Sequence, residues 1–185
     1  MALNNTTGRY GTFSIGMHWL MFLLIVAVYA SINLRELFPK GSDPREALKA
    51  LHFMLGLTVF ILVAIRLSVR IKRDSPPIYP APVAWQRTSA KTVHVLLYGL
   101  MIVMPLLGWL TLSAAGKPIP FYGLQLPALI SENKALGKTI IEIHKTIGTI
   151  GYYLIGIHTL AALFHHYIKR DTTLVRMLPC LKRKV

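Results

Sequence analysis

The sequence is poor in cysteine and in acidic residues. One cysteine, Cys180, and seven Asp or Glu stand among 185 residues, of which only 15% are charged. A single cysteine argues against a disulfide framework, a thiolate-ligated cluster and a covalently attached c-type haem. With 54% hydrophobic residues and a mean hydropathy of +0.50, the chain is too apolar for an ordinary soluble domain. The composition therefore favours a protein that crosses a membrane several times.

Four apolar stretches are long enough to cross a bilayer, which takes about 20 helical residues. None shows the strict polar–apolar alternation of a barrel strand. Because the backbone in lipid must satisfy its own hydrogen bonds, we predict an all-α membrane protein, a four-helix bundle running up-down-up-down. The predicted helices span about residues 13–32, 47–69, 92–115 and 140–168 of a single transmembrane domain, 1–185. The first stretch is longer than a signal-peptide core and lacks a cleavage site, so we expect a retained helix.

The segments between the apolar stretches are polar or rich in proline. Residues 33–46 form a polar loop, and residues 72–86 hold four prolines that rule out a continuous helix. Residues 116–137 form the longest loop, whose aromatic and proline residues predict partial packing onto the bundle. Pro105 lies inside the third stretch and predicts a kink there.

The net charge of +14 raises the question of nucleic-acid binding, but the distribution of charge argues against it. The N-terminus, the second loop and the C-terminus carry thirteen of the 21 Lys and Arg and only two acids. The other side carries eight Lys and Arg and five acids. The positive-inside rule therefore places both termini in the cytoplasm, with basic clusters facing anionic lipid headgroups.

Two histidines of the fourth stretch, His144 and His158, are fourteen residues apart. Fourteen helical residues advance about 21 Å and bring the two side chains within about 40° of each other. Both imidazoles should therefore face the bundle interior, one near each side of the membrane. Ionisable side chains within a membrane are costly and mark functional sites by default.

The depths of the other histidines suggest two pairs. His52 should lie near the outer end of the second helix, level with His144, and His18 near the inner end of the first, level with His158. Each pair could supply both axial ligands of a b-type haem iron, giving two haem b cofactors. A pair of ligands without an open position favours electron transfer over oxygen chemistry at the metal. His94 lies at a depth similar to His18 and could replace it.

Glycine placement agrees with flat cofactors in the bundle. Gly56 follows His52 by four residues and Gly148 follows His144 by four, so each should lie one turn along on nearly the same face. A small residue there leaves room for a macrocycle, although glycine is also common wherever membrane helices pack closely. Cations that could meet haem propionates are Arg66 and Lys91 inside, and Lys49, Lys117 and Lys145 outside.

Two alternatives remain for the histidines. They could be buried hydrogen-bonding residues, or they could relay protons through a haem-free transporter bundle. A zinc site is less favoured because no depth assembles the three or four ligands that zinc prefers. His165 is seven residues beyond His158 and about 10 Å closer to the cytoplasm, where it could contact a quinone headgroup. His166 points about 100° away and should meet lipid headgroups.

This pattern resembles the bacterial cytochrome b561 family along nearly the whole chain. The resemblance is carried by His18-Trp19, His52, His144, His158, His165-His166-Tyr167, the proline-rich second loop and Leu174 to Pro179. It implies a multi-pass protein of the bacterial inner membrane that binds two haem b. It also implies the same ligand pairs, His52 with His144 outside and His18 with His158 inside, and a quinone near His165. His94 matches a family histidine that is not a ligand.

Within the family, the likeness is greatest to small di-haem members that act as superoxide oxidases. This implies an oxidoreductase that passes electrons from superoxide on the periplasmic side to ubiquinone near the cytoplasmic side. The long loop, residues 116–137, diverges most from the family pattern. The alternative is a membrane-anchor cytochrome that links a periplasmic redox protein to the quinone pool with the same helices and ligands.

Overall fold

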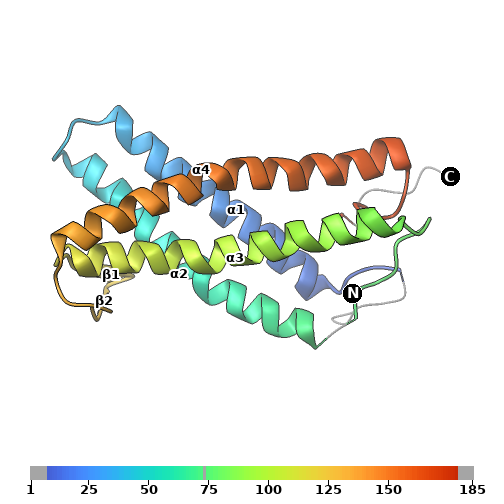
Figure 1. The fold of residues 1–185 in the computed structure, drawn as a ribbon, viewed down its shortest axis with the longest axis horizontal. Helices are drawn as coiled ribbons and strands as arrows, with labels where there is room; N and C mark the ends of the chain where they lie inside the picture. The colour runs from blue at the N-terminus through green and yellow to red at the C-terminus, as the bar shows by residue number, and fades with distance from the viewer. Residues whose placement is uncertain (1–7, 73, 179–185) are drawn as a thin grey trace.

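The structure is a computed structural model that describes residues 8–72 and 74–178. The predictions made for Pro179, Cys180 and the tail beyond them therefore lie outside the described residues. Four long helices alternate in direction (Figure 1), and their bounds are α1 Thr12–Leu34, α2 Asp43–Ile71, α3 Ala84–Ala114 and α4 Lys134–Phe164. All four are long and apolar enough to cross a membrane, so the predicted four-helix bundle is confirmed.

The two ends of the bundle differ in character. The start of α1, the end of α4 and the α2–α3 connection lie together at one end, which we call the basic end (Figure 1). The other end, the hairpin end, carries the single 3₁₀ turn η1 (Arg35–Leu37) and the antiparallel strands β1 (Ile119–Phe121) and β2 (Leu124–Leu126). At the basic end, α4 continues into the π-helical turn η2 (His165–Lys169).

Three helices begin earlier than hydropathy predicts. Helix α2 begins at Asp43 rather than 47, α3 at Ala84 rather than 92, and α4 at Lys134 rather than 140. The added residues include charged or polar side chains in each helix, so a search for continuous apolar stretches starts after them. The Asn133 side chain accepts a hydrogen bond from the backbone N–H of Leu136 (3.0 Å), which caps α4 outside the apolar stretch.

The loop between α3 and α4 packs onto the bundle, as predicted, but through a β-hairpin that was not predicted. Tyr122 and Gly123 at its tip both have positive φ, 45° and 86°, which suits a two-residue hairpin turn. Ile119 of β1 is only 2% exposed and packs with Leu57 of α2 and Leu112 of α3. The hairpin is therefore part of the folded bundle.

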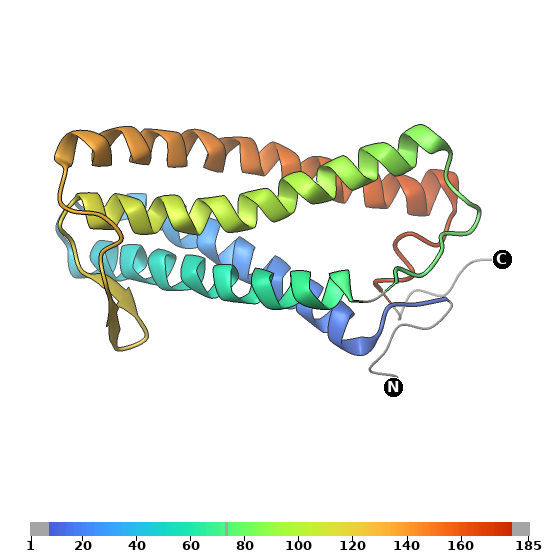
Figure 2. The ribbon, with the colours of Figure 1, turned by 60° about the horizontal axis from the view of Figure 1, so that its bottom comes forward.

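The four helices do not form a closed square (Figure 2). Helix α1 packs on α2, α2 on α3, and α3 on α4. Within the described residues, Cα atoms of α4 come within 8 Å of α3 but of neither α1 nor α2. Side chains bridge this gap: the Tyr29 hydroxyl donates to the Gly148 carbonyl (2.8 Å), and Asn33 Nδ2 donates to the Tyr152 hydroxyl (2.7 Å).

Few apolar side chains are buried within the chain. Met21, Val59 and Val63 form a small core between α1 and α2. Large apolar side chains of the spans point outward instead, among them Leu23 at 62% and Leu160 at 67% exposure. Lipid is the medium in which such surfaces are stable, so the packing agrees with hydropathy in placing all four helices in a membrane.

Candidate functional site

The hairpin-end histidines meet across the gap between α2 and α4. The ring centroids of His52 and His144 lie 6.2 Å apart. His52 Nδ1 lies 3.0 Å from the Val28 carbonyl oxygen of α1. Because a carbonyl only accepts, the proton of His52 must be on Nδ1, and the lone pair on Nε2 is free for a metal. His144 Nδ1 is buried without a hydrogen-bond partner.

The basic-end histidines meet in the same way across the gap between α1 and α4. The ring centroids of His18 and His158 also lie 6.2 Å apart. Beside them, Arg66 of α2 donates to the Ser14 carbonyl oxygen (3.2 Å) and, because a guanidinium only donates, also to His18 Nδ1 (3.4 Å). A neutral His18 in this contact carries its proton on Nε2, so metal binding at Nε2 would require the proton to move to Nδ1. The structure thus brings together both pairs that depth alone predicts.

The repeated spacing of 6.2 Å suits an iron between two imidazoles. An imidazole nitrogen binds a metal at about 2 Å, so two such rings on opposite sides of one ion have centroids about 6 Å apart. Directly hydrogen-bonded rings would lie about 5 Å apart, because the two nitrogens then approach to about 3 Å. The spacing therefore fits axial ligation better than mutual hydrogen bonding.

The surroundings of the two predicted glycines differ. A Cβ added to Gly56 would meet no atom within 4 Å, in agreement with the predicted room for a flat group. A Cβ added to Gly148 would meet the Met104 Cε at 3.3 Å, so this glycine faces α3 rather than open space. The prediction of room beside Gly148 was therefore wrong, because α3 approaches α4 closely there.

His94 is a third imidazole at the basic end. Its ring centroid is 5.2 Å from that of His158, and its Nδ1 donates to the Ala90 carbonyl oxygen (2.6 Å). The distance to His158 is about 1 Å shorter than in the two pairs, so as the rings lie, an iron fits between His18 and His158 better than between His94 and His158.

His165 lies in the turn η2, where its Nδ1 is hydrogen-bonded to the carboxylate of Asp171. Asp171 is only 7% exposed and also accepts from the backbone N–H of Thr173 (2.8 Å). Although burial raises the pKa of the Asp171 carboxyl, the hydrogen bonds from His165 and Thr173 outweigh it and hold the pKa below its ordinary value. His166 makes a ring contact with its neighbour Tyr167 instead.

Sequence reasoning missed Asp171. The available signal was charge, because Asp171 is one of only two acids on the basic side of the chain. Its contact with His165 depends on the π-helical turn and on Arg170, whose φ of 53° reverses the chain. The segment that follows is fixed to the bundle by Trp19, whose Nε1 donates to the Met177 carbonyl oxygen (2.9 Å).

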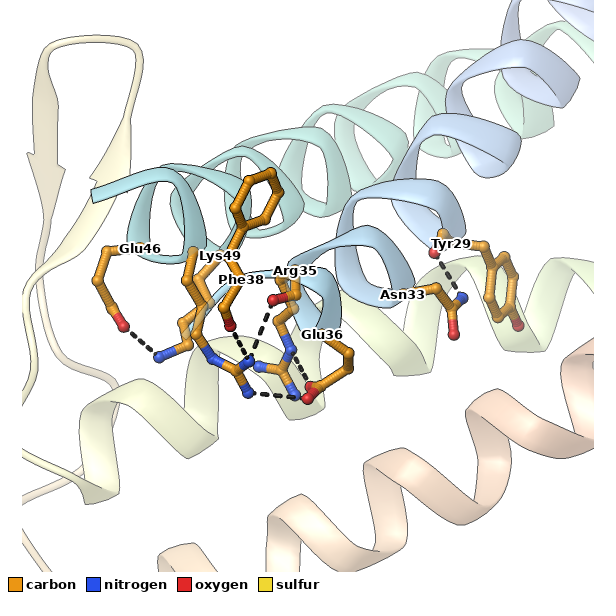
Figure 3. A network of polar contacts seen from close by, with 8 residues as sticks. Tyr29, Asn33, Arg35, Glu36, Phe38, Glu46 and Lys49 are labelled. Carbon is orange, nitrogen blue, oxygen red and sulfur yellow. Dashed lines mark hydrogen bonds and ion pairs between the residues drawn. The ribbon is translucent and has the colours of Figure 1, made fainter. Parts of the chain in front are cut away.

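At the hairpin end, acids neutralise much of the positive charge. Arg45 is 8% exposed, donates to the Arg35 and Phe38 carbonyl oxygens and contacts the Glu36 carboxylate at 2.9 Å. Figure 3 shows Arg35, Glu36 and Phe38 close together in this network. The other cations with an ion pair here are Arg35, Lys49, Lys134 and Lys145. Among the described cations at this end, those with no acidic oxygen within 4 Å are Lys40, Lys117 and Lys138.

Comparison with known proteins gives concordant matches. The family model for prokaryotic cytochrome b561 matches residues 9–180. The chain is 37% identical to cytochrome b561 homolog 1 of Escherichia coli K12 over 92% of this chain and 97% of that protein. It is 34% identical to the probable superoxide oxidase CybB of Yersinia pestis, over 92% of this chain and 96% of that protein. It is 28% identical to cytochrome b561 homolog 2 of Escherichia coli K12, over 96% of this chain and 95% of that protein.

Proposed function

The chain belongs to the prokaryotic cytochrome b561 family, and on that premise we propose that it oxidises superoxide and reduces ubiquinone through two haem b groups. The family makes it a multi-pass electron-transfer protein of the inner membrane and implies haem b binding. The proposal adds the number of haems, their ligands and the two substrates. It also places the basic end in the cytoplasm and the hairpin end in the periplasm, by the positive-inside rule.

The observation that carries the proposal is the repeated histidine pair. His18 with His158 and His52 with His144 share a centroid spacing of 6.2 Å and lie about 21 Å apart along α4. Haem supplies one-electron chemistry when bound. His18 with His158 and His52 with His144 would each supply two imidazole nitrogens to hold a haem iron, and the apolar helices around them would keep water from two redox sites at two depths of the membrane.

The substrates follow from the ends of the bundle and from one relative. The 34% identical relative is named as a probable superoxide oxidase, which supports superoxide as the donor at the hairpin end. At the basic end, His165 and the ionised Asp171 are suited to hold a quinone headgroup and to pass protons to it. Two superoxide ions lose one electron each and become oxygen, and ubiquinone gains both electrons and two cytoplasmic protons to become ubiquinol.

The purified chain tests this function directly. We expect the reduced absorption spectrum of a b-type haem, about two haems per chain, and superoxide loss that stops when ubiquinone is omitted. A colourless protein from haem-replete cells would refute the haem assignment. Two bound haems without superoxide activity would refute only the assignment of superoxide as the electron donor. That result would favour the alternative of a membrane-anchor cytochrome that exchanges electrons with a periplasmic redox protein.

A further inference from the structure

The two histidine pairs have the same spacing but different partners at Nδ1. His52 Nδ1 faces the Val28 carbonyl oxygen at 3.0 Å. His18 Nδ1 faces a guanidinium nitrogen of Arg66 at 3.4 Å. One ligand thus has a hydrogen-bond acceptor behind it, and the other has a cation.

These partners change the donor strength of the imidazole in opposite directions. A carbonyl that accepts the Nδ1 proton pushes electron density onto the ring and makes it a stronger ligand. A guanidinium has only donors, so if His18 bound iron through Nε2 and carried its proton on Nδ1, Arg66 could not accept that proton and would give His18 no such support. Its positive charge also lies close to the site, where partial burial weakens screening by water. A weaker ligand and a nearby cation both stabilise the reduced, less positive iron.

The position of Arg66 is held by the fold. Its other terminal nitrogen donates to the Ser14 carbonyl oxygen (3.2 Å), one helical turn before His18. Among the described residues, the buried acid of the basic end is Asp171, which is hydrogen-bonded to His165 and Thr173. At the hairpin end, by contrast, Arg35 and Arg45 share the Glu36 carboxylate, which offsets one of their two positive charges.

We propose that Arg66 gives the haem of His18 and His158 the higher reduction potential of the two, so that electrons entering at the hairpin end move energetically downhill to the basic end. The inference depends on the proposed ligand pairs and adds the direction of transfer. Each transfer moves one electron between the sites, and no bond forms or breaks. Arg66 acts through His18 and through its charge, so it is a positioning residue rather than a catalytic one.

Spectroelectrochemical titration of the purified protein tests this without any turnover. Both midpoint potentials are measured in the wild type, in Arg66→Gln and in Arg66→Lys. We expect Arg66→Gln to lower the higher potential and leave the lower one in place, which narrows the gap between them. Arg66→Lys keeps the positive charge and should retain most of the difference between the two midpoint potentials. Arg70→Gln is the matched control, because Arg70 is one turn further along α2 and lies over the Tyr98 ring at 5.9 Å instead.

Haem content separates this inference from the proposed function. Fewer than two haems in the wild type would refute the ligand pairs themselves. With two haems present, the inference is refuted if Arg66→Gln moves neither potential, moves the lower one, or loses a haem. It is also refuted if Arg66→Lys lowers the higher midpoint potential as far as Arg66→Gln does, since the effect would then not depend on the charge beside His18. An equal lowering of that potential by Arg70→Gln would refute it for the same reason.

Discussion

Replacing His144 or His158 with alanine should remove one haem and leave the other bound. Each substitution removes one of the two imidazoles of a pair, and the second ring alone cannot hold both axial positions. The two positions lie about 21 Å apart along α4, well beyond the distance of about 10 Å at which neighbouring substitutions usually interact. Each single variant should therefore keep about half of the wild-type haem, and the double variant should keep none.

The assay is haem content per chain in the monodisperse, purified protein, with helix content as a check that the variant is folded. His166→Ala is the matched control, because its ring contacts Tyr167 rather than another histidine. It should keep both haems. A folded single variant that retains two haems, or that loses both, would refute the pairing.

Three further outcomes follow from the charges and the packing. The described hairpin-end cations without an ion pair, Lys40, Lys117 and Lys138, should attract the superoxide anion and raise its rate of encounter. Raising ionic strength should therefore slow superoxide loss, since the screening length falls from about 10 Å at 0.1 M to about 3 Å at 1 M salt; an unchanged rate in stopped-flow assays would refute this attraction. Asp171→Asn should melt at a lower temperature than the wild type near pH 7. Because the folded protein holds the Asp171 pKa below its unfolded value, its contribution is complete above about pH 4 and lost as the pH falls through the folded pKa, so the two melting curves should converge in acid. Gly137→Val should lower the melting temperature, because even a Cβ at Gly137 would lie 3.3 Å from that of Ala114; equal stability would show that α3 and α4 can separate there.

Hydropathy and helix periodicity were enough to predict the parts of the molecule that matter most for the site. Long apolar stretches predict the four membrane spans. The fourteen-residue interval between His144 and His158 predicts that both imidazoles of the fourth helix face the bundle interior. The alternation of helix direction then places His52 level with His144, and His18 and His94 level with His158. Which of these rings meet depends on helix packing, which the structure provides. The spans and the matched depths depend on local sequence and on the thickness of a bilayer, both of which can be read before any packing is known.

Features that depend on local turns or on helix contacts were not predictable. The start of α4 is capped by Asn133 and carries Lys134 and Lys138, which interrupt the apolar stretch that hydropathy detects. The strands of the hairpin are three residues each, too short to show a period. Met104 occupies the space beside Gly148 because α3 approaches α4, and the sequence does not state which helices are neighbours. The contact between His165 and Asp171 depends on a single π-helical turn.

The distance of α4 from α1 and α2 bears on how the protein is assembled in the cell. Polypeptide contacts alone leave the first and last helices joined by a few hydrogen bonds, such as that from Tyr29 to Gly148. Iron porphyrin clamped from both sides would then be the cross-link that completes the tertiary structure. Chains made under haem starvation should accordingly reach the membrane with their helices inserted but splayed, and be cleared by proteases until the cofactor is delivered.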